Sequence, residues 1–148
     1  MPNDTESKFG DPDSRIAQTA RWTLLLRPKQ PTLGSLVLVC REPVRAFGDV
    51  STEGYTELGA LVRRVESTLR EFTAFERINW LMLMMVDPDV HFHVIPRYTG
   101  TRSFAGQAFD DAGWPGPPNL DAAVSPEAAV REALLAGLRQ AWQRHAGD

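Results

Sequence analysis

The sequence predicts a long amphipathic helix from Ser51 to about residue 72, and this helix limits the folds open to the chain. Ser51 is typical of a helix N-cap, and Thr52 and Glu53 follow it in the first turn. Apolar side chains then recur at helical spacing, with charged side chains between them that face water. The apolar positions are Leu58, Leu61, Val62, Val65, Leu69 and Phe72. The pattern predicts a helix of about five turns with one buried face.

Strand-like segments flank this helix in pairs. Residues 22–26 and 36–40 are apolar runs separated by a stretch rich in proline and glycine, which predicts an antiparallel pair buried on both faces. Residues 78–85 read as a buried strand, and residues 90–95 resume a strand after a short Asp-Pro break, so these two are expected to be antiparallel neighbours. Strands grouped around helices without βαβ alternation indicate the α+β class, with a mainly antiparallel sheet of about five strands.

The ends of the chain give weaker patterns. Residues 1–14 are polar and predict a flexible lead-in, whereas residues 15–148 are expected to form a single domain, because two full cores need more chain. Residues 99–124 contain many glycines and prolines and read as loop. Ser125 is expected to cap a C-terminal helix, with Pro126 at its first position.

Composition excludes several classes of function. The chain has 16 lysines and arginines against 19 aspartates and glutamates, a net charge of −3, which argues against a surface that coats nucleic acid. No run of roughly 18 apolar residues could span a membrane, and residues 1–20 lack the apolar core of a signal peptide. A single cysteine, Cys40, excludes an internal disulfide framework and a cysteine-rich zinc site. A cytoplasmic protein is expected.

Two of the three histidines, His91 and His93, stand two residues apart. On a strand they would share one face with Asp89 and Ile95, with the rings roughly 6 to 7 Å apart. Three interpretations compete. The rings are structural; they form a two-histidine, one-carboxylate metal site with Asp89; or one imidazole attacks a phosphoryl centre while the other donates to the oxyanion or leaving group.

Residues 89–97, Asp-Val-His-Phe-His-Val-Ile-Pro-Arg, resemble the signature of the histidine triad (HIT) nucleotide hydrolases and transferases. That signature is three histidines alternating with apolar residues, often followed by Pro-Arg. Upstream, residues 34–41 look like the family's Gly-His strand, although Ser35 stands in place of its histidine. Residues 113–118 are similar to a Trp-Pro stretch of some bacterial members. The resemblance covers roughly residues 21 to 118.

The resemblance implies a HIT-like fold, a nucleotide or nucleoside phosphate ligand, and hydrolysis or transfer at a nucleoside α-phosphate. His91 matches the family's nucleophile, and His93 matches the histidine that contacts phosphate oxygens and assists the leaving group. Nucleoside phosphoramidates or dinucleoside polyphosphates are the implied substrates. The family also implies a homodimer and requires neither a metal nor another cofactor.

Three further residues are implied to bind the substrate. Asn79 would hold phosphate or ribose, or is an ordinary strand-end amide; Arg97 would neutralise phosphate charge, or is a solvated arginine at a strand end. Asp89 stands where the first histidine is usual, and it would either orient His91 or hold it protonated. Asp89 and the bulky pair Met84-Met85 favour the alternative, a nucleotide-binding or interaction module that is weakly active or inactive.

Overall fold

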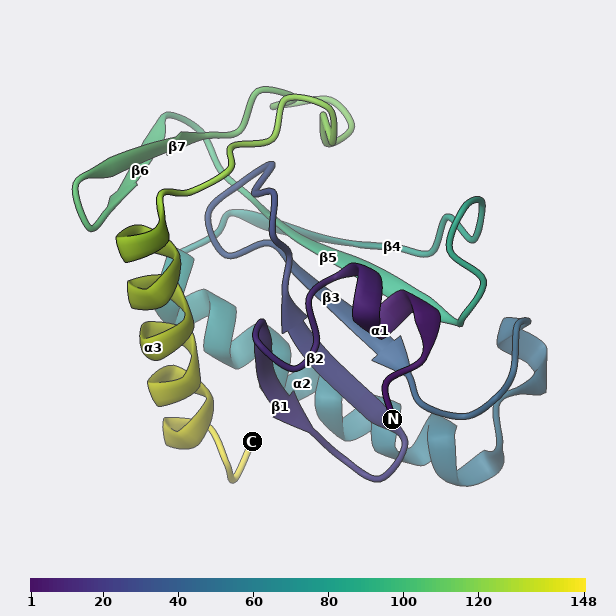
Figure 1. Cartoon of the computed structure of the whole chain (residues 1–148). Coiled ribbons are helices and arrows are strands. Elements are labelled where there is room, and N and C mark those ends of the chain that lie inside the picture. The colour runs from purple at the N-terminus through teal and green to yellow at the C-terminus, as the bar shows by residue number, and fades with distance from the viewer.

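The computed structural model describes all 148 residues and contains a five-stranded sheet, a two-stranded sheet and three α-helices (Figure 1). The α+β class and the mainly antiparallel sheet predicted from the sequence are confirmed. In chain order the elements are α1 (Asp4–Lys8), β1 (Arg15–Gln18), β2 (Trp22–Leu26), β3 (Leu36–Cys40), a short 3₁₀ helix η1 (Phe47–Asp49), α2 (Thr52–Thr73), β4 (Arg77–Leu81), β5 (His91–Arg97), β6 (Thr101–Phe104), β7 (Gln107–Asp110) and α3 (Ala128–Arg144).

The main sheet has the strand order β1-β2-β3-β5-β4, and every neighbouring pair is antiparallel. The predicted pairs β2–β3 and β4–β5 are both confirmed, and every residue of β2 and β3 is buried. The prediction of a buried strand over residues 78–85 is wrong in extent and burial. β4 ends at Leu81 and none of its residues is fully buried, because it is an edge strand with a neighbour on one side only.

Side chains alternate between the two faces of the main sheet, and cross-strand partners share a face. Val37 is paired with His93, and these lie on what we call the histidine face. Leu38 is paired with Phe92, and these lie on the opposite face, which we call the helix face. α2 and α3 cover the helix face, whereas α1 and the chain after it lie over the histidine face (Figure 1).

The long helix predicted from the sequence is confirmed as α2. The Ser51 hydroxyl accepts a hydrogen bond from the Gly54 amide at 3.0 Å, as an N-cap should, and the helix ends where Ala74 takes a left-handed conformation with φ of 53°. Its apolar face joins α3 and the sheet in a core of 21 buried residues. This core packs against the helix face of β5 and so fixes the strand that carries the histidines.

The N-terminal residues correct the prediction of a flexible lead-in over residues 1–14. Asn3 and Glu6 form a capping box at the start of α1. The carboxylate of Glu6 is buried and also accepts a hydrogen bond from the Thr23 hydroxyl at 2.6 Å, while Phe9 packs on the apolar residues of the histidine face. Polar composition predicted solvation, but these polar groups are satisfied by specific partners on the sheet.

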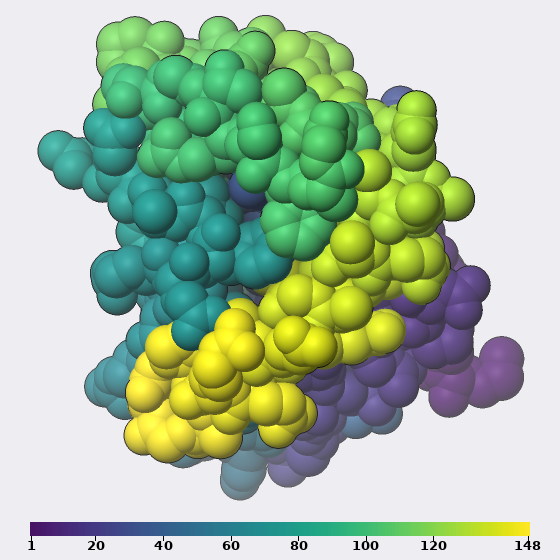
Figure 2. All heavy atoms as spheres, turned by 90° about the vertical axis from the view of Figure 1, so that its left-hand side faces the viewer, coloured from purple at the N-terminus to yellow at the C-terminus, as the bar shows by residue number.

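Residues 99–124 are likewise not the continuous loop that their composition predicts. β6 and β7 form a hairpin closed by Ala105 and Gly106, both with positive φ, which is the geometry that a two-residue hairpin turn requires. Ala-Gly is a weak sequence signal for such a turn, so the composition of this segment indicates a loop and not a hairpin. The hairpin lies against α3 on the face seen in Figure 2, and Phe104 packs on Phe72 of α2 at a ring distance of 5.2 Å.

The start of α3 also differs from the prediction. The helix begins at Ala128 with Glu127 as its N-cap, so Ser125 and Pro126 precede it. The Glu127 carbonyl accepts the first helical bond, from the Arg131 amide, but no side chain caps the helix. None of the three helices combines the length and the apolar run that a bilayer span requires.

Candidate active site

β5 places His91 and His93 side by side on the histidine face, as the alternation of residues predicts. Their ring centroids are 5.2 Å apart and the rings are inclined at 78°. Val90 and Val94 point into the core on the opposite face. Both rings are shielded from bulk water, with 2% of His91 and 6% of His93 exposed.

A main-chain hydrogen bond determines which nitrogen of His91 carries the proton. Nδ1 lies 2.7 Å from the carbonyl oxygen of Asp89. A carbonyl oxygen only accepts, so Nδ1 of His91 must donate, and in the neutral ring the lone pair then lies on Nε2. No protein group hydrogen-bonds Nε2. His91 therefore has the protonation pattern of a nucleophile or base.

His93 is held in its neutral form. Burial and, to a smaller extent, the positive charge of Arg27 together lower the pKa of His93 to about 4. Its Nδ1 is buried without a hydrogen-bond partner in the protein. At neutral pH the ring can therefore offer a hydrogen bond to a bound group, and it carries no charge to be neutralised.

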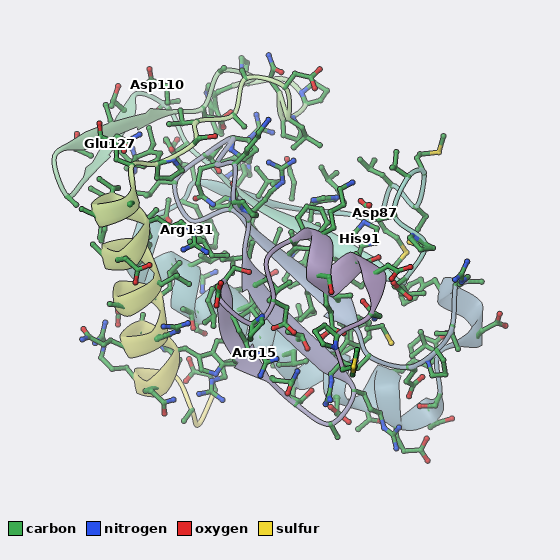
Figure 3. The ribbon with its side chains drawn as sticks, in the orientation of Figure 1. Arg15, Asp87, His91, Asp110, Glu127 and Arg131 are labelled. Atoms are coloured by element: carbon green, nitrogen blue, oxygen red, sulfur yellow. The ribbon has the colours of Figure 1, made fainter.

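The two rings form one wall of a cavity of about 560 Å³. The remaining walls come from four segments that are far apart in the sequence: α1, the loop after β2, the loop after β4 and the loop before α3. Figure 3 shows His91 and Asp87 near one another beside α1, well separated from Glu127 and Arg131 of α3. The lining residues besides the histidines are Lys8, Phe9, Arg27, Pro28, Lys29, Leu83, Met84, Met85, Val86, Asp87, Leu120 and Asp121.

The ring of Phe9 lies against both imidazoles. Its ring lies 5.7 Å from that of His93, edge to face, and 6.3 Å from that of His91. Next to it, the Lys8 ammonium pairs with Asp87 at 2.6 Å and so connects α1 to the loop after β4. The N-terminal segment therefore contributes lining residues to the cavity.

Asp89 does not line this cavity, although the resemblance implied that it binds substrate. Its carboxylate accepts hydrogen bonds from the amide and the hydroxyl of Thr5, at 3.1 and 3.0 Å, and its own amide donates to the same hydroxyl at 3.2 Å. The negative charge is thus turned towards α1. The Asp89 side chain makes no hydrogen bond to His91, and the main-chain carbonyl of Asp89 orients the ring instead.

Asn79 and Arg97 lie together, but in a second hollow and not beside the histidines. They share it with Arg77 and with residues 114–117. Arg97 is buried and donates to Asp111 through Nε at 2.7 Å and to the Asn79 side-chain oxygen at 2.8 Å. Arg97 is therefore neither a solvated arginine nor free to neutralise a phosphate at His91.

The metal-site interpretation of the histidine pair lacks its third ligand. It requires the Asp89 carboxylate beside His91 and His93, and that carboxylate instead binds Thr5. No group of three or more histidine, cysteine, aspartate or glutamate side chains lies close enough together to hold a metal ion. The residues at the site do not fit the predicted two-histidine, one-carboxylate arrangement.

Sequence reasoning singled out Met84 and Met85 of the cavity wall, but it missed the lining residues that come from α1, from the loop after β2 and from the loop before α3. Phe9 is the one large apolar residue after Met1 in the polar stretch 1–14, and that isolation was a usable signal. Arg27 and Lys29 lie in the connection between β2 and β3, and β3 pairs with β5. A connection between paired strands lies at an end of the sheet, so both residues could have been placed there from the sequence. Asp121 could not be placed, because nothing in the sequence fixes the path of its loop.

The structure has the fold of histidine triad proteins. A histidine triad protein from Bradyrhizobium japonicum matches with a TM-score of 0.75 and 22% identity, covering 95% of this chain and 96% of that one. A histidine triad (HIT) protein from Sinorhizobium meliloti matches with a TM-score of 0.74 and 20% identity, covering 95% of each chain. One from Marinobacter aquaeolei VT8 covers 99% of this chain and 98% of its own, with a TM-score of 0.70 and 17% identity.

No protein-family model matches the sequence, and no curated protein matches it either. At the identities of the solved structures, the likeness establishes the fold. The HIT-like fold implied by residues 89–97 is therefore confirmed, while the activity is a separate question that the geometry of the cavity has to answer.

Proposed function

We propose that this protein binds a nucleotide or a related nucleoside phosphate in the His91–His93 cavity and catalyses hydrolysis or transfer at the α-phosphate. One observation carries the proposal: the Asp89 carbonyl fixes the proton of His91 on Nδ1, so that the lone pair of Nε2 is free of any protein partner. The structures of similar fold are described as histidine triad proteins, and one from Sulfolobus tokodaii as a hypothetical histidine triad nucleotide-binding protein.

In the proposed first step, Nε2 of His91 attacks the phosphorus atom. A bond between nitrogen and phosphorus forms, and the bond to the leaving group breaks with its electron pair. In the second step a water oxygen attacks the same phosphorus, and the phosphorus–nitrogen bond breaks with its electron pair returning to Nε2. One proton of the water stays on the new phosphate hydroxyl, and the other goes to the leaving group or to solvent. His91 then returns to its initial state.

His93 assists in both steps by hydrogen bonding. Because its pKa is about 4, the ring is neutral at pH 7, so we assign it a donor to a phosphoryl oxygen or the leaving group and not a permanent positive charge. Preorganised donors of this kind act where charge develops in the transition state, and in a site shielded from water they act strongly.

The second candidate function is a module that binds a nucleotide without turning it over. The burial of both imidazoles and the position of Phe9 against them favour it, since a ligand must displace or slide past that ring to reach phosphorus. Exposed Met85 and Leu83 at the mouth of the cavity add apolar surface that suits binding more than chemistry.

Trapping of a covalent intermediate tests the proposal. Rapid acid-free quenching during turnover of a nucleoside phosphoramidate should yield a nucleotidyl adduct on His91, detectable by mass spectrometry. His91→Ala should abolish the adduct and reduce turnover on the order of 10³-fold or more, and His93→Gln should reduce turnover on the order of 10²-fold. The matched control is His145→Ala, since His145 lies at the end of α3 and bonds Asp148.

The outcomes separate the two functions. An adduct on His91 that His145→Ala leaves intact supports the enzyme. Nucleotide binding that is equal in the wild type and His91→Ala, with no turnover of a broad panel of nucleoside phosphates by either, excludes catalysis and leaves the binding module.

We also propose that the protein is a homodimer that pairs β4 with its symmetry copy. β4 is an edge of the main sheet, and its outer side has no strand partner within the chain. An unpaired edge of this kind is a template for another strand. Light scattering coupled to size-exclusion chromatography should give twice the chain mass of 16.5 kDa, and a monomer at all concentrations up to about 100 μM would contradict the proposal.

A further inference from the structure

Arg27 is the one arginine that lines the histidine cavity, and its charge is not compensated. No carboxylate lies within ion-pair distance of its guanidinium. Its side chain makes one hydrogen bond to the protein, which Nη1 donates to the Lys29 carbonyl at 2.7 Å. Its Nε is buried with no hydrogen-bond partner. The burial lowers the pKa of Arg27, and no acid raises it.

Such an arrangement is unfavourable in the free protein. Placing a charge out of water is costly unless a partner compensates it, and a buried donor without an acceptor loses free energy as well. By contrast, Arg97 is paired with Asp111, and Arg15 is paired with Asp11. The guanidinium of Arg27 is therefore prepared for an anion that the protein itself does not supply.

The charges around the cavity locate that anion. Lys8 is neutralised by Asp87, so the cations left over are Arg27 and Lys29, which both come from the loop after β2. The acid left over is Asp121, which is exposed and on the loop before α3. The excess positive charge therefore lies on the loop after β2, which lines the same cavity as the two imidazoles. An anion bound there would lie beside the group that contacts the histidines.

We propose that Arg27, assisted by Lys29, forms a second anion subsite that binds a phosphate group of the ligand other than the one that His91 attacks. This inference rests on the proposed function for the identity of the attacked group. A planar guanidinium with several donors suits a phosphate, which it binds through two parallel hydrogen bonds, and a flexible lysine adds a point charge at the rim. Ligands with two phosphates are then bound more tightly than those with one.

The second phosphate has two chemical sources. It belongs either to the leaving group, as in a nucleoside 5′-diphosphate, or to the sugar, as in a nucleoside 3′,5′-bisphosphate. The two differ in where the extra phosphate lies relative to the attacked phosphorus, so calorimetric titration with adenosine 5′-monophosphate, adenosine 5′-diphosphate and adenosine 3′,5′-bisphosphate distinguishes them. A parallel set in His91→Ala protein blocks turnover.

We expect one of the two bisphosphorylated ligands to bind at least tenfold more tightly than the monophosphate. Arg27→Gln should remove most of this difference while changing the affinity for the monophosphate by less than about threefold. Lys29→Gln should have a smaller effect in the same direction. The matched control is Arg63→Gln, because Arg63 is an exposed arginine of α2, on the other side of the sheet.

A stability measurement separates a binding role from a structural one. Since Arg27 is partly buried and unpaired, Arg27→Gln should leave the thermal unfolding midpoint unchanged or raise it, whereas an arginine that holds the fold would lower it. A lowered midpoint together with an equal loss of affinity for all three nucleotides would overturn the proposal.

Inorganic pyrophosphate keeps the test independent of the proposed function. If no nucleotide binds, the proposed function is wrong, and pyrophosphate binding that Arg27→Gln weakens at least tenfold still supports the subsite. If pyrophosphate binds equally to the wild type and Arg27→Gln, or to neither, the subsite does not exist. If wild-type protein binds the mono- and bisphosphates with equal affinity, the ligand makes no second contact and the proposal fails.

Discussion

The two faces of the main sheet are closed by different means. The helix face is covered by α2 and α3, and its core of 21 buried residues is predominantly apolar. The histidine face has an apolar cluster of only four residues, and the five-residue α1 is attached to it by hydrogen bonds from buried polar groups. The first arrangement gives the sheet its stability, and the second leaves room for a cavity beside the imidazoles.

The two faces therefore tolerate substitutions differently. A face closed by dispersion and water exclusion is intolerant of lost volume everywhere, because its neighbours are close-packed. A face closed by a few hydrogen bonds depends on those groups alone, and the rest of its surface is free to bind a ligand.

The largest expected effect comes from the helix face. Leu69→Ala should reduce the free energy of unfolding by about 2–5 kcal/mol, because Leu69 is fully buried and its removal leaves an enclosed void. Phe9→Ala on the histidine face should cost about 2 kcal/mol, since that ring borders an open cavity. Urea unfolding measures both.

The same two variants should also differ in ligand affinity. Phe9→Ala should change nucleotide binding, because the ring lies against both imidazoles, while Leu69→Ala should leave binding unchanged once the protein is folded. Equal losses of stability in the two variants would mean that the histidine face is packed as tightly as the helix face.

The next effect is a pH dependence that arises on the histidine face. The pKa of His93 is depressed in the folded protein from 6.5 to about 4, so the folded state binds this proton less readily than the unfolded state does. The stability contribution is complete above pH 6.5 and is lost as the pH falls towards 4, by about 3 kcal/mol in total.

A comparison of urea unfolding at pH 7.5 and pH 5 checks this dependence. The wild type should lose stability more steeply than His93→Gln, which removes the titrating group. If the two proteins show the same loss between these pH values, His93 is not held neutral by its surroundings.

The smallest effect concerns the attachment of α1. Asp89→Asn removes the charge that strengthens the hydrogen bonds to Thr5, and should lower the free energy of unfolding by about 1 kcal/mol and speed amide exchange within α1. The control is Asp13→Asn, at an exposed aspartate of the same segment. The nitrogen-15 spectrum of His91 should still show the proton on Nδ1, and a shift of that proton to Nε2 would contradict the role given to the main-chain carbonyl.

The sequence was sufficient for the parts of the fold that rest on periodicity. α2 and the antiparallel strand pairs follow from the spacing of apolar residues, which local sequence determines. The alternation along β5 correctly placed His91 and His93 on one face, away from the core residues Val90 and Val94.

The sequence was insufficient where tertiary contacts decide. The placement of α1 depends on a hydrogen bond that the buried carboxylate of Glu6 accepts from Thr23 on β2. The local sequence around either residue does not indicate that contact. Asp89 is another case: its residue type predicted an effect on His91, but its carboxylate is used by Thr5. The sequence context of Arg97 predicted a phosphate ligand, whereas in the structure its guanidinium is paired with Asp111.

The main-chain hydrogen bond to His91 has a consequence for redesign of the site. Every amino acid carries the carbonyl group that residue 89 uses, so the side chain there is chemically uncoupled from the ring that it precedes. A substitution at residue 89 therefore leaves in place the hydrogen bond that orients the imidazole and acts on the docking of α1, which forms one wall of the cavity.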